Sequence, residues 1–174
     1  YGDLNASGDV TAGTDCDDSE GTVSPEGTEV EADGVDSDCD GLEICYVDGD
    51  GDGIGSSTTG TSTTLDCSES GFATTLTDCD DSDNNTYPGI ASNESNSTEC
   101  MTDADGDGYG DLNASGNVTA GTDCDDDAAT TIPGAGTNEA DTSACMADAD
   151  GDGYGDLNAS GDVTAGTDCD DSEG

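Results

Sequence analysis

The hydrophobic positions of this chain are scattered singly between runs of Asp, Gly, Ser and Thr, and they follow no helical period. An amphipathic helix needs apolar residues that recur about every 3.6 positions, so no helix is predicted. Short runs such as residues 162–167 are candidates for brief strands. The pattern therefore predicts an irregular fold with little regular secondary structure and a few short β-strands. No stretch approaches the ~20 apolar residues of a membrane span.

The apolar content is too small for a conventional hydrophobic core. Val, Leu, Ile and Phe make up roughly a tenth of the 174 residues, and Trp is absent. Chains below about 20% in these residues with a high net charge usually stay disordered, because burial cannot offset the chain entropy. Another interaction must hold this fold together, and the sequence offers clustered Asp and nine Cys.

The charge balance excludes several function classes. The chain has 44 Asp and Glu and no Lys, Arg or His, which gives a net charge of −44. Neutralising the phosphates of nucleic acid requires Lys or Arg, and so does binding to an anionic membrane surface. Without His or Lys, most general-base and Schiff-base chemistry is also lost. We therefore expect neither nucleic-acid binding nor enzymatic activity.

The chain is built from internal repeats. Residues 1–21 and 154–174 are identical, and residues 101–126 match 146–171 at all but two positions. The chain is thus interpreted as one segment of a longer tandem array, with a proteolytic or expressed fragment as the alternative. Each repeat would contact only its neighbours. The predicted subunits are residues 1–45, 46–100 with an insertion, 101–145 and 146–174, the last equivalent to the start of the first.

The cysteine pattern predicts disulfides. Cys16 and Cys169 occupy the same position one period apart, which leaves eight Cys per period and hence up to four bonds in an oxidising, extracellular setting. Zinc or iron–sulfur ligation is disfavoured because no Cys-x-x-Cys pair occurs. Aligning the subunits predicts three equivalent bonds, and the two remaining Cys would link adjacent subunits. The predicted pairs are Cys16–Cys45, Cys79–Cys100, Cys124–Cys145 and Cys39–Cys67.

Four stretches follow the pattern Asp-x-Asp-x-Asp-Gly: Asp36–Gly41, Asp48–Gly53, Asp103–Gly108 and Asp148–Gly153. Alternate positions place three carboxylates on one concave side of a turning backbone, and the Gly permits the turn. Such carboxylates repel one another unless a cation lies between them. Oxygen ligands without imidazole favour a hard cation, with Ca²⁺ first and Mg²⁺ second.

These loops match only the first half of an EF-hand loop. Counted from Asp103, position 12 is Ala114 where an EF-hand has a bidentate Glu, and no helical period flanks the loop. The missing ligand is expected from the Asp-Cys-Asp-Asp step that follows each loop, which would complete the site or form a second one. Scattered acidic residues on a solvated surface are the alternative, but the regular spacing in register with Cys argues against it.

The predicted metal ligands share this loop-and-step pattern, with a backbone carbonyl from the seventh loop position. They are Asp48, Asp50, Asp52, Ile54, Asp78, Asp80 and Asp81; Asp103, Asp105, Asp107, Tyr109, Asp111, Asp123, Asp125 and Asp126; Asp148, Asp150, Asp152, Tyr154, Asp156, Asp168, Asp170 and Asp171; and Asp36, Asp38, Asp40, Asp15, Asp17 and Asp18.

The chain contains the run DADGDGYGD, followed by TDCDD and PG, and it also contains the run DGVDSDCDG. This combination of motifs resembles the metal-binding repeat of MopE-type bacterial surface proteins. It is more distantly similar to the calcium-binding type 3 repeats of thrombospondin. The resemblance covers essentially the whole chain and implies an extracellular location with structural Ca²⁺ at these Asp residues. The chain departs from the family at Ala32, where a Cys is common, and it lacks the imidazole that the copper site of the family's namesake would require.

Asn-x-Ser/Thr sequons are frequent, and Ser56–Thr64 is either an O-glycosylated tract or a flexible loop. The candidate glycosylation sites are Asn5, Asn84, Asn93, Asn96, Asn113, Asn117 and Asn158.

Together these features predict a structural protein of the cell surface or extracellular space. Several Ca²⁺ ions per period and disulfides would stabilise tandem repeats that form a filament or matrix fibre, with the protein itself as its partner. The alternatives are the stalk of a surface adhesin and an extracellular cation-binding or mineral-nucleating matrix protein.

Overall fold

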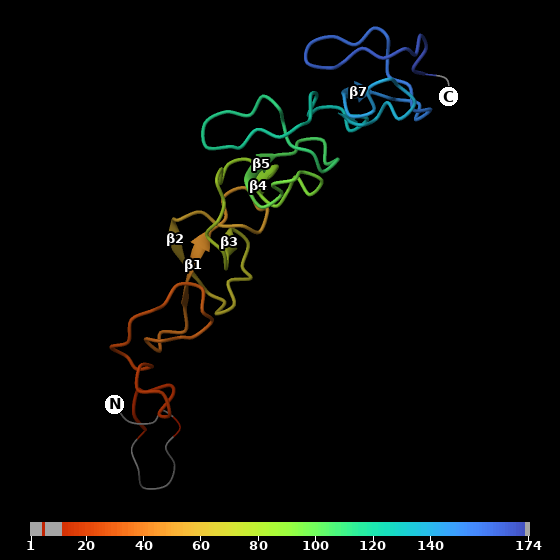
Figure 1. Ribbon diagram of the computed structural model, residues 1–174. Helices are drawn as coiled ribbons and strands as arrows, with labels where there is room; N and C mark the ends of the chain where they lie inside the picture. Colours follow the sequence, from red (N-terminus) through yellow and green to blue (C-terminus); the bar gives the residue numbers. More distant parts are fainter. Residues whose placement is uncertain (1–4, 6–11, 173–174) are drawn as a thin grey trace. The chain divides into compact units, whose positions relative to one another are not determined.

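The computed structural model describes residue 5 and residues 12–172, and its fold is mostly loops and turns (Figure 1). No residue in this part of the chain is helical, so nothing there could cross a membrane as a helix. Seven strands of two to five residues provide the regular structure. They are β1 (Glu43–Val47), β2 (Thr59–Ser62), β3 (Phe72–Ala73), β4 (Thr86–Pro88), β5 (Cys100–Thr102), β6 (Thr131–Pro133) and β7 (Cys145–Ala147).

The chain divides into two compact units, Tyr1–Asn84 and Asn85–Gly174. The first contains an antiparallel sheet in the order β2-β1-β3, in which Cys45 pairs with Gly60 and Tyr46 with Ala73. Along β1, Glu43 and Cys45 are buried, and the intervening Ile44 is partly exposed. Because successive strand residues point to opposite faces, Glu43 and Cys45 share the inner face of this sheet.

The second unit contains two antiparallel pairs with the same design. β4 pairs with β5, and β6 pairs with β7. Each first strand ends on a Pro, which has no N–H to donate to a ladder, and a Gly at positive φ follows (Gly89 at 102°, Gly134 at 87°). The Ile90 N–H donates to the Tyr87 carbonyl across the first of these turns. This geometry is that of type II turns at Pro88-Gly89 and Pro133-Gly134.

The interior of the described residues is as polar as it is apolar. The buried apolar residues are few and small, and they include Met101, Met146 and three Cys. Buried polar residues are equally numerous, and Glu43 and Asp123 are both 0% exposed. The small apolar content of the sequence is thus reflected in an interior that contains carboxylates and disulfides.

Two predicted disulfides are present. Cys124 and Cys145, which are 21 positions apart in sequence, are bonded. Cys79 and Cys100 are both bonded as well, and they bond to each other because every other bonded Cys has its own partner. Cys169 is an exposed free thiol.

The other two predicted disulfides, Cys16–Cys45 and Cys39–Cys67, are wrong: the structure forms Cys16–Cys39 and Cys45–Cys67 instead. The first reason is that Cys39 lies where Cys145 lies in the second unit. The Cys16 N–H faces the Cys39 sulfur at 3.2 Å, as the Cys124 N–H faces the Cys145 sulfur at 3.3 Å.

The second reason lies in the Ser/Thr-rich insertion, part of which is β2 rather than flexible loop. Pairing of β2 with β1 places Cys67, a few residues beyond β2, beside Cys45, and both Cys side chains are buried. The expectation of a strand at residues 162–167 is also wrong. There the Thr164 N–H donates to the carbonyl of Cys145 in β7 and the Gly166 N–H donates to that of Asp156, and no residue of this run belongs to a strand.

Candidate metal centre

The loop Asp103–Gly108 turns around the side chain of its first residue. The two oxygens of Asp103 accept hydrogen bonds from the N–H groups of Gly106 at 2.8 Å and Gly108 at 3.0 Å. Both glycines have positive φ, 81° and 93°, a conformation that residues with a Cβ rarely adopt. The first Asp and the glycines therefore shape the loop, and the two middle Asp residues remain to line it.

Asp105 and Asp107 each use one carboxylate oxygen to support the turn. The Asp107 N–H donates to Asp105 at 3.2 Å, and the Tyr109 N–H donates to Asp107 at 2.8 Å. The second oxygen of each carboxylate is buried and has no hydrogen-bond partner. A buried polar atom without a partner lowers the stability of the fold by about 1–3 kcal/mol, and by more when it is charged. A ligand bound to these two oxygens would remove that penalty.

The Asp-Cys-Asp-Asp step brings a third such oxygen to the loop. Asp123 forms a parallel bridge with Asp111, in which the Asp123 N–H donates to the Gly110 carbonyl at 2.9 Å. One Asp123 oxygen accepts from the Asp125 N–H, and the other is buried without a partner. Ligand oxygens of Asp105, Asp107 and Asp123 all lie within 4.8 Å of one another, which is compact enough for one cation.

A second group lies next to the first and shares Asp105. Asp103, Asp105 and Asp126 also offer oxygens within 4.8 Å of one another, and the Ala104 N–H holds Asp126 there at 3.0 Å. A hollow lined by Asp111, Asp125 and Asp126 opens beside this group. The sequence left open whether the step completes the loop site or forms a second one. The structure brings carboxylates together for both.

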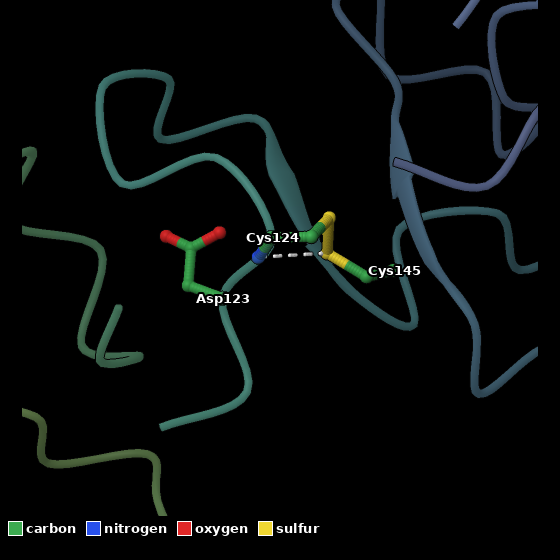
Figure 2. A group of neighbouring side chains, drawn as sticks. All are labelled: Asp123, Cys124 and Cys145. Atoms are coloured by element: carbon green, nitrogen blue, oxygen red, sulfur yellow. Dashed lines mark hydrogen bonds between the residues drawn. A yellow bond between two sulfur atoms is a disulfide. The ribbon is translucent and has the colours of Figure 1, made fainter. Parts of the chain in front are cut away.

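Figure 2 shows the Asp123 carboxylate pointing away from the Cys124–Cys145 disulfide. The two sulfurs are close to Asp123 but are bonded to each other, and only a free thiolate is an effective metal ligand. The disulfide therefore ties the step to the start of β7, and the carboxylates alone face the candidate centre.

Burial, together with neighbouring negative charges, raises the pKa of two carboxylates from the step. Burial raises the pKa of Asp123 to about 6, and the charges of Asp107 and Asp105 add to the effect. Burial raises the pKa of Asp126 to about 7, with further increases from Asp111 and Asp123. The charged forms are thus disfavoured without a counter-ion, and the chain has no basic side chain to supply one. A bound cation would reverse this penalty.

The loop Asp48–Gly53 in the first unit has the same hydrogen bonds. Gly51 and Gly53 N–H groups donate to Asp48 at 2.7 and 3.1 Å, and the Gly49 N–H donates to Asp81 at 2.7 Å. Here too, buried carboxylate oxygens without partners belong to the second and third loop Asp and to the first Asp of the step: Asp50, Asp52 and Asp78.

The loop Asp148–Gly153 repeats the arrangement near the end of the chain. Gly151 and Gly153 N–H groups donate to Asp148 at 2.8 and 3.0 Å, and the Ala149 N–H donates to Asp171 at 2.9 Å. Asp150 carries the buried oxygen without a partner. The same hydrogen bonds thus recur in three loops, although an insertion separates one of them from its step.

The fourth stretch, Asp36–Gly41, differs from the other three. Asp36 accepts from the N–H groups of Asp40 and Gly41, both at 3.0 Å, but Cys39 lies inside the loop and is bonded to Cys16. The carboxylates that gather here belong to Asp36, Asp38 and Glu29. Glu29 was missed from sequence because it precedes the motif by seven positions and has no counterpart in the other loops.

The carboxylates of Asp15, Asp17 and Asp40 accept hydrogen bonds from residues two positions further along the chain. The Asp17 N–H donates to Asp15 and the Ser19 N–H to Asp17, which leaves the role of Asp15, Asp17 and Asp18 a prediction. Asp40 is exposed, and its carboxylate accepts from the Leu42 N–H at 2.8 Å.

Sequence reasoning also missed a repeated Asn-Glu pair that braces each loop of the second unit. The Asn93 side-chain amide donates to the Asp107 carbonyl at 2.9 Å. One Glu94 oxygen accepts from the N–H and hydroxyl of Thr122 at 2.6 and 2.7 Å, next to Asp123. Asn138 and Glu139 make the same contacts with Asp152 and Thr167. The signal was the recurrence of Asn-Glu at the same place in two subunits.

All seven sequon asparagines are exposed, so glycosylation remains a prediction. The side-chain amides of Asn93, Asn113 and Asn158 make hydrogen bonds, with the Asp107 carbonyl, Asp162 and Asp156 respectively.

A family model described as a putative metal-binding motif matches three segments, residues 15–45, 78–92 and 123–142. Each segment begins at an Asp-Cys-Asp-Asp step, and the first also contains Asp36–Gly41. The loops Asp48–Gly53, Asp103–Gly108 and Asp148–Gly153 lie outside the matched segments. Neither a curated protein nor a solved structure matches the chain.

Proposed function

This chain carries the MopE-type metal-binding motif in three segments, and from this premise we propose that it is an extracellular structural protein whose tandem units fold around Ca²⁺. One observation carries the proposal. At the loop of Asp105 and Asp107, the carboxylates of these two residues and of Asp123 converge, and each of the three carries a buried oxygen without a partner. With no basic side chain in the sequence, only protons or bound cations can neutralise them.

The donor set supports calcium over other metals. All converging donors are carboxylate oxygens, His is absent, and eight of the nine Cys are in disulfides. Copper and zinc sites favour imidazole or thiolate, so the copper in the name of the family model has no matching ligands here. Ca²⁺ accepts six to eight oxygens in flexible geometry, whereas Mg²⁺ requires a tighter octahedron.

Within such a protein, metal binding and folding are one process. The carboxylates repel one another until the ion is bound, so the free energy of binding stabilises the folded loops. Asp103 and the glycines set the loop shape, Asp123 and Asp126 add carboxylates from the step, and the disulfide keeps the step in place.

The extracellular and filamentous parts of the proposal rest on other features. Disulfides persist in oxidising compartments, which favours secretion or the cell surface. The identity of residues 1–21 and 154–174 favours a periodic array in which the protein is its own partner. We also propose that the chain is not an enzyme, since no basic side chain is available to activate a nucleophile.

The test is metal analysis combined with electron microscopy before and after chelation. Purified protein should contain calcium, and removal of calcium should swell or collapse its filaments and change the far-UV circular dichroism spectrum. Unchanged filaments after complete calcium removal would overturn the structural role. Weak calcium binding with unchanged shape would instead support a cation reservoir, and a non-repetitive tip seen at the end of each filament would support an adhesin stalk.

A further inference from the structure

Three cysteines occupy the same position in successive Asp-Cys-Asp-Asp steps, and they differ in whether they are bonded. Cys16 is bonded to Cys39, and Cys124 is bonded to Cys145. Cys169 is exposed and free, and the other eight Cys of the described residues are all in disulfides. The position that carries a bond in two steps therefore carries a free thiol in the third.

The backbone presents these three cysteines in the same way. In each step, the N–H of the Asp after the Cys donates to the carboxylate of the Asp before it, at 3.1 Å around Cys16 and at 2.9 Å around both Cys124 and Cys169. A turn follows each step. Residues 154–174, which contain Cys169, are also identical in sequence to residues 1–21. The step of Cys169 can therefore take the place of the step of Cys16.

The loop before Cys169 is less covered than its equivalent in the middle of the chain. Asp123 is 0% exposed, whereas its equivalent Asp168 is partly exposed, although the two subunits are almost identical in sequence up to the step. The Asn-Glu pairs that brace the two loops make the same contacts in both subunits. The difference in burial therefore arises downstream of the step, where Cys124 is bonded and Cys169 is not.

The disulfide that holds the equivalent step in the first unit is accessible. Cys16 is exposed and Cys39 is partly exposed, whereas Cys45 and Cys67 are both buried. A thiolate can exchange with a disulfide only where it can reach a sulfur atom. Of these two disulfides, Cys16–Cys39 is thus the one that a thiol of another molecule can reach.

We propose that Cys169 joins one copy of the chain to a second copy by forming a disulfide with Cys39 of that copy. The Cys169 thiolate attacks the Cys39 sulfur, the bond between Cys39 and Cys16 breaks, and Cys16 leaves as a thiolate that takes up the proton lost by Cys169. One disulfide replaces another, so no oxidant is required and the number of free thiols per chain is unchanged.

The junction is heterologous, because the end of one copy bonds to the beginning of the next, and it can therefore repeat as an open-ended array. It rests on the self-association in the proposed function and assigns that association to a pair of residues. Two chains of net charge −44 repel each other, so bound cations and added salt favour their approach.

The experiment follows the purified, monomeric full chain by non-reducing gel electrophoresis and by counting free thiols. Incubation with calcium in about 0.15 M salt, at mildly alkaline pH to favour exchange, should produce a ladder of covalent multimers that reduction abolishes. The count should stay at one free thiol per chain. Cys169→Ser should abolish the ladder. Ser172→Ala is the matched control, since Ser172 is exposed in the following turn, and it should form the ladder as wild type does.

A mixing experiment identifies the acceptor. A donor chain with Cys16→Ser and Cys39→Ser keeps the attacking thiol and has no acceptor disulfide, whereas Cys169→Ser keeps the acceptor disulfide and has no attacking thiol. Neither should form multimers alone. Together they should form a covalent dimer and release the Cys16 thiol of the acceptor, which a maleimide label then marks. If the donor chain does not fold, the wild-type ladder and its thiol count decide the question.

Three results would overturn the inference: a wild-type chain that stays monomeric, a purified monomer without a free thiol, or a dimer that loses its free thiols and so contains a Cys169–Cys169 bond. Calcium-dependent filaments of wild-type length in Cys169→Ser would leave the proposed function standing and remove only this junction. A wild-type ladder that forms equally well after complete calcium removal, with an unchanged circular dichroism spectrum, would support the junction and contradict the structural role of calcium.

Discussion

Asp123 lies beside Asp111 in a parallel bridge, with the Leu112 N–H donating to the Asp123 carbonyl at 2.7 Å. This backbone contact, twelve residues apart in sequence, places a fully buried carboxylate next to a loop that already holds two others. Asp156 and Asp168 repeat the bridge in the next subunit. Backbone pairing between loop and step therefore brings the carboxylates of the candidate metal centre together.

Asp123→Asn should weaken calcium binding at the middle loop about 10- to 100-fold, because a carboxylate binds the cation more strongly than an amide carbonyl does. This range corresponds to the loss of an interaction with a charged group, which typically contributes about 1.5–3 kcal/mol to stability. Without metal, the same change should raise stability, because it removes a buried charge that has one unpartnered oxygen and no counter-ion. Calorimetric titration and chemical unfolding, with and without calcium, measure both effects.

Asp127→Asn is the matched control, because Asp127 is exposed and lies just past the step. It should leave calcium affinity within about twofold, as expected for a screened surface charge. Equal losses of affinity in the two variants would mean that net charge, and not the loop centre, attracts the ion.

Glu94→Gln should lower calcium affinity at the middle loop by about 10-fold, the low end of the range for residues that orient metal ligands. The Glu94 carboxylate accepts two short bonds from Thr122 and a longer one from Gly110 at 3.4 Å, and so holds the step against the loop. Calorimetric titration measures the affinity, and Glu99→Gln, an exposed glutamate on the same segment, should match wild type. A loss of affinity confined to the control would contradict the bracing role.

Part of the site was predictable because it depends only on the spacing of Asp and Gly residues within a short stretch of the sequence. The loop Asp103–Gly108 needs only its own residues to form, and the low apolar content correctly predicted an interior with few apolar side chains. The disulfide of Cys45 was not predictable, because it depends on β2 pairing with β1 after an insertion. Glu29 was missed for a similar reason, since only the chain's path brings its carboxylate near Asp36.

Replacing Cys45 and Cys67 together with Ala should destabilise the first unit by about 2–4 kcal/mol, the usual contribution of a disulfide that closes a loop of this size. The bond fastens the insertion to β1, and both side chains are buried, so loss of packing adds to the effect. Chemical unfolding in calcium measures the change, and Cys169→Ser should have almost no effect because Cys169 is exposed and free.

Peptide mapping provides an independent check on the same bonds. Trypsin has no Lys or Arg to cut after, so the digest must use a protease that cleaves at acidic residues. Linked peptides should join Cys16 to Cys39 and Cys45 to Cys67. Peptides that join Cys16 to Cys45 would contradict the fold of the first unit.

The metal-free and calcium-bound forms should respond to pH in opposite directions. In the metal-free fold, the pKa values of Asp123 and Asp126 are raised to about 6 and about 7. The unfolded chain titrates near the ordinary Asp value of about 3.9, so the folded state binds more protons between these limits. Their contribution to stability is therefore fully present below about pH 4 and is lost as pH rises through 6 to 7.

Calcium reverses the trend because the ion requires charged carboxylates, so affinity should increase from pH 5 to 8 and binding should release protons below about pH 7. Calorimetry in buffers of different ionisation enthalpy measures that release. Asp126→Asn should reduce the proton release at the middle loop, whereas Asp127→Asn should not. If affinity were the same at pH 5.5 and pH 8 in the wild-type protein, the cation would not be binding at the buried carboxylates of Asp123 and Asp126.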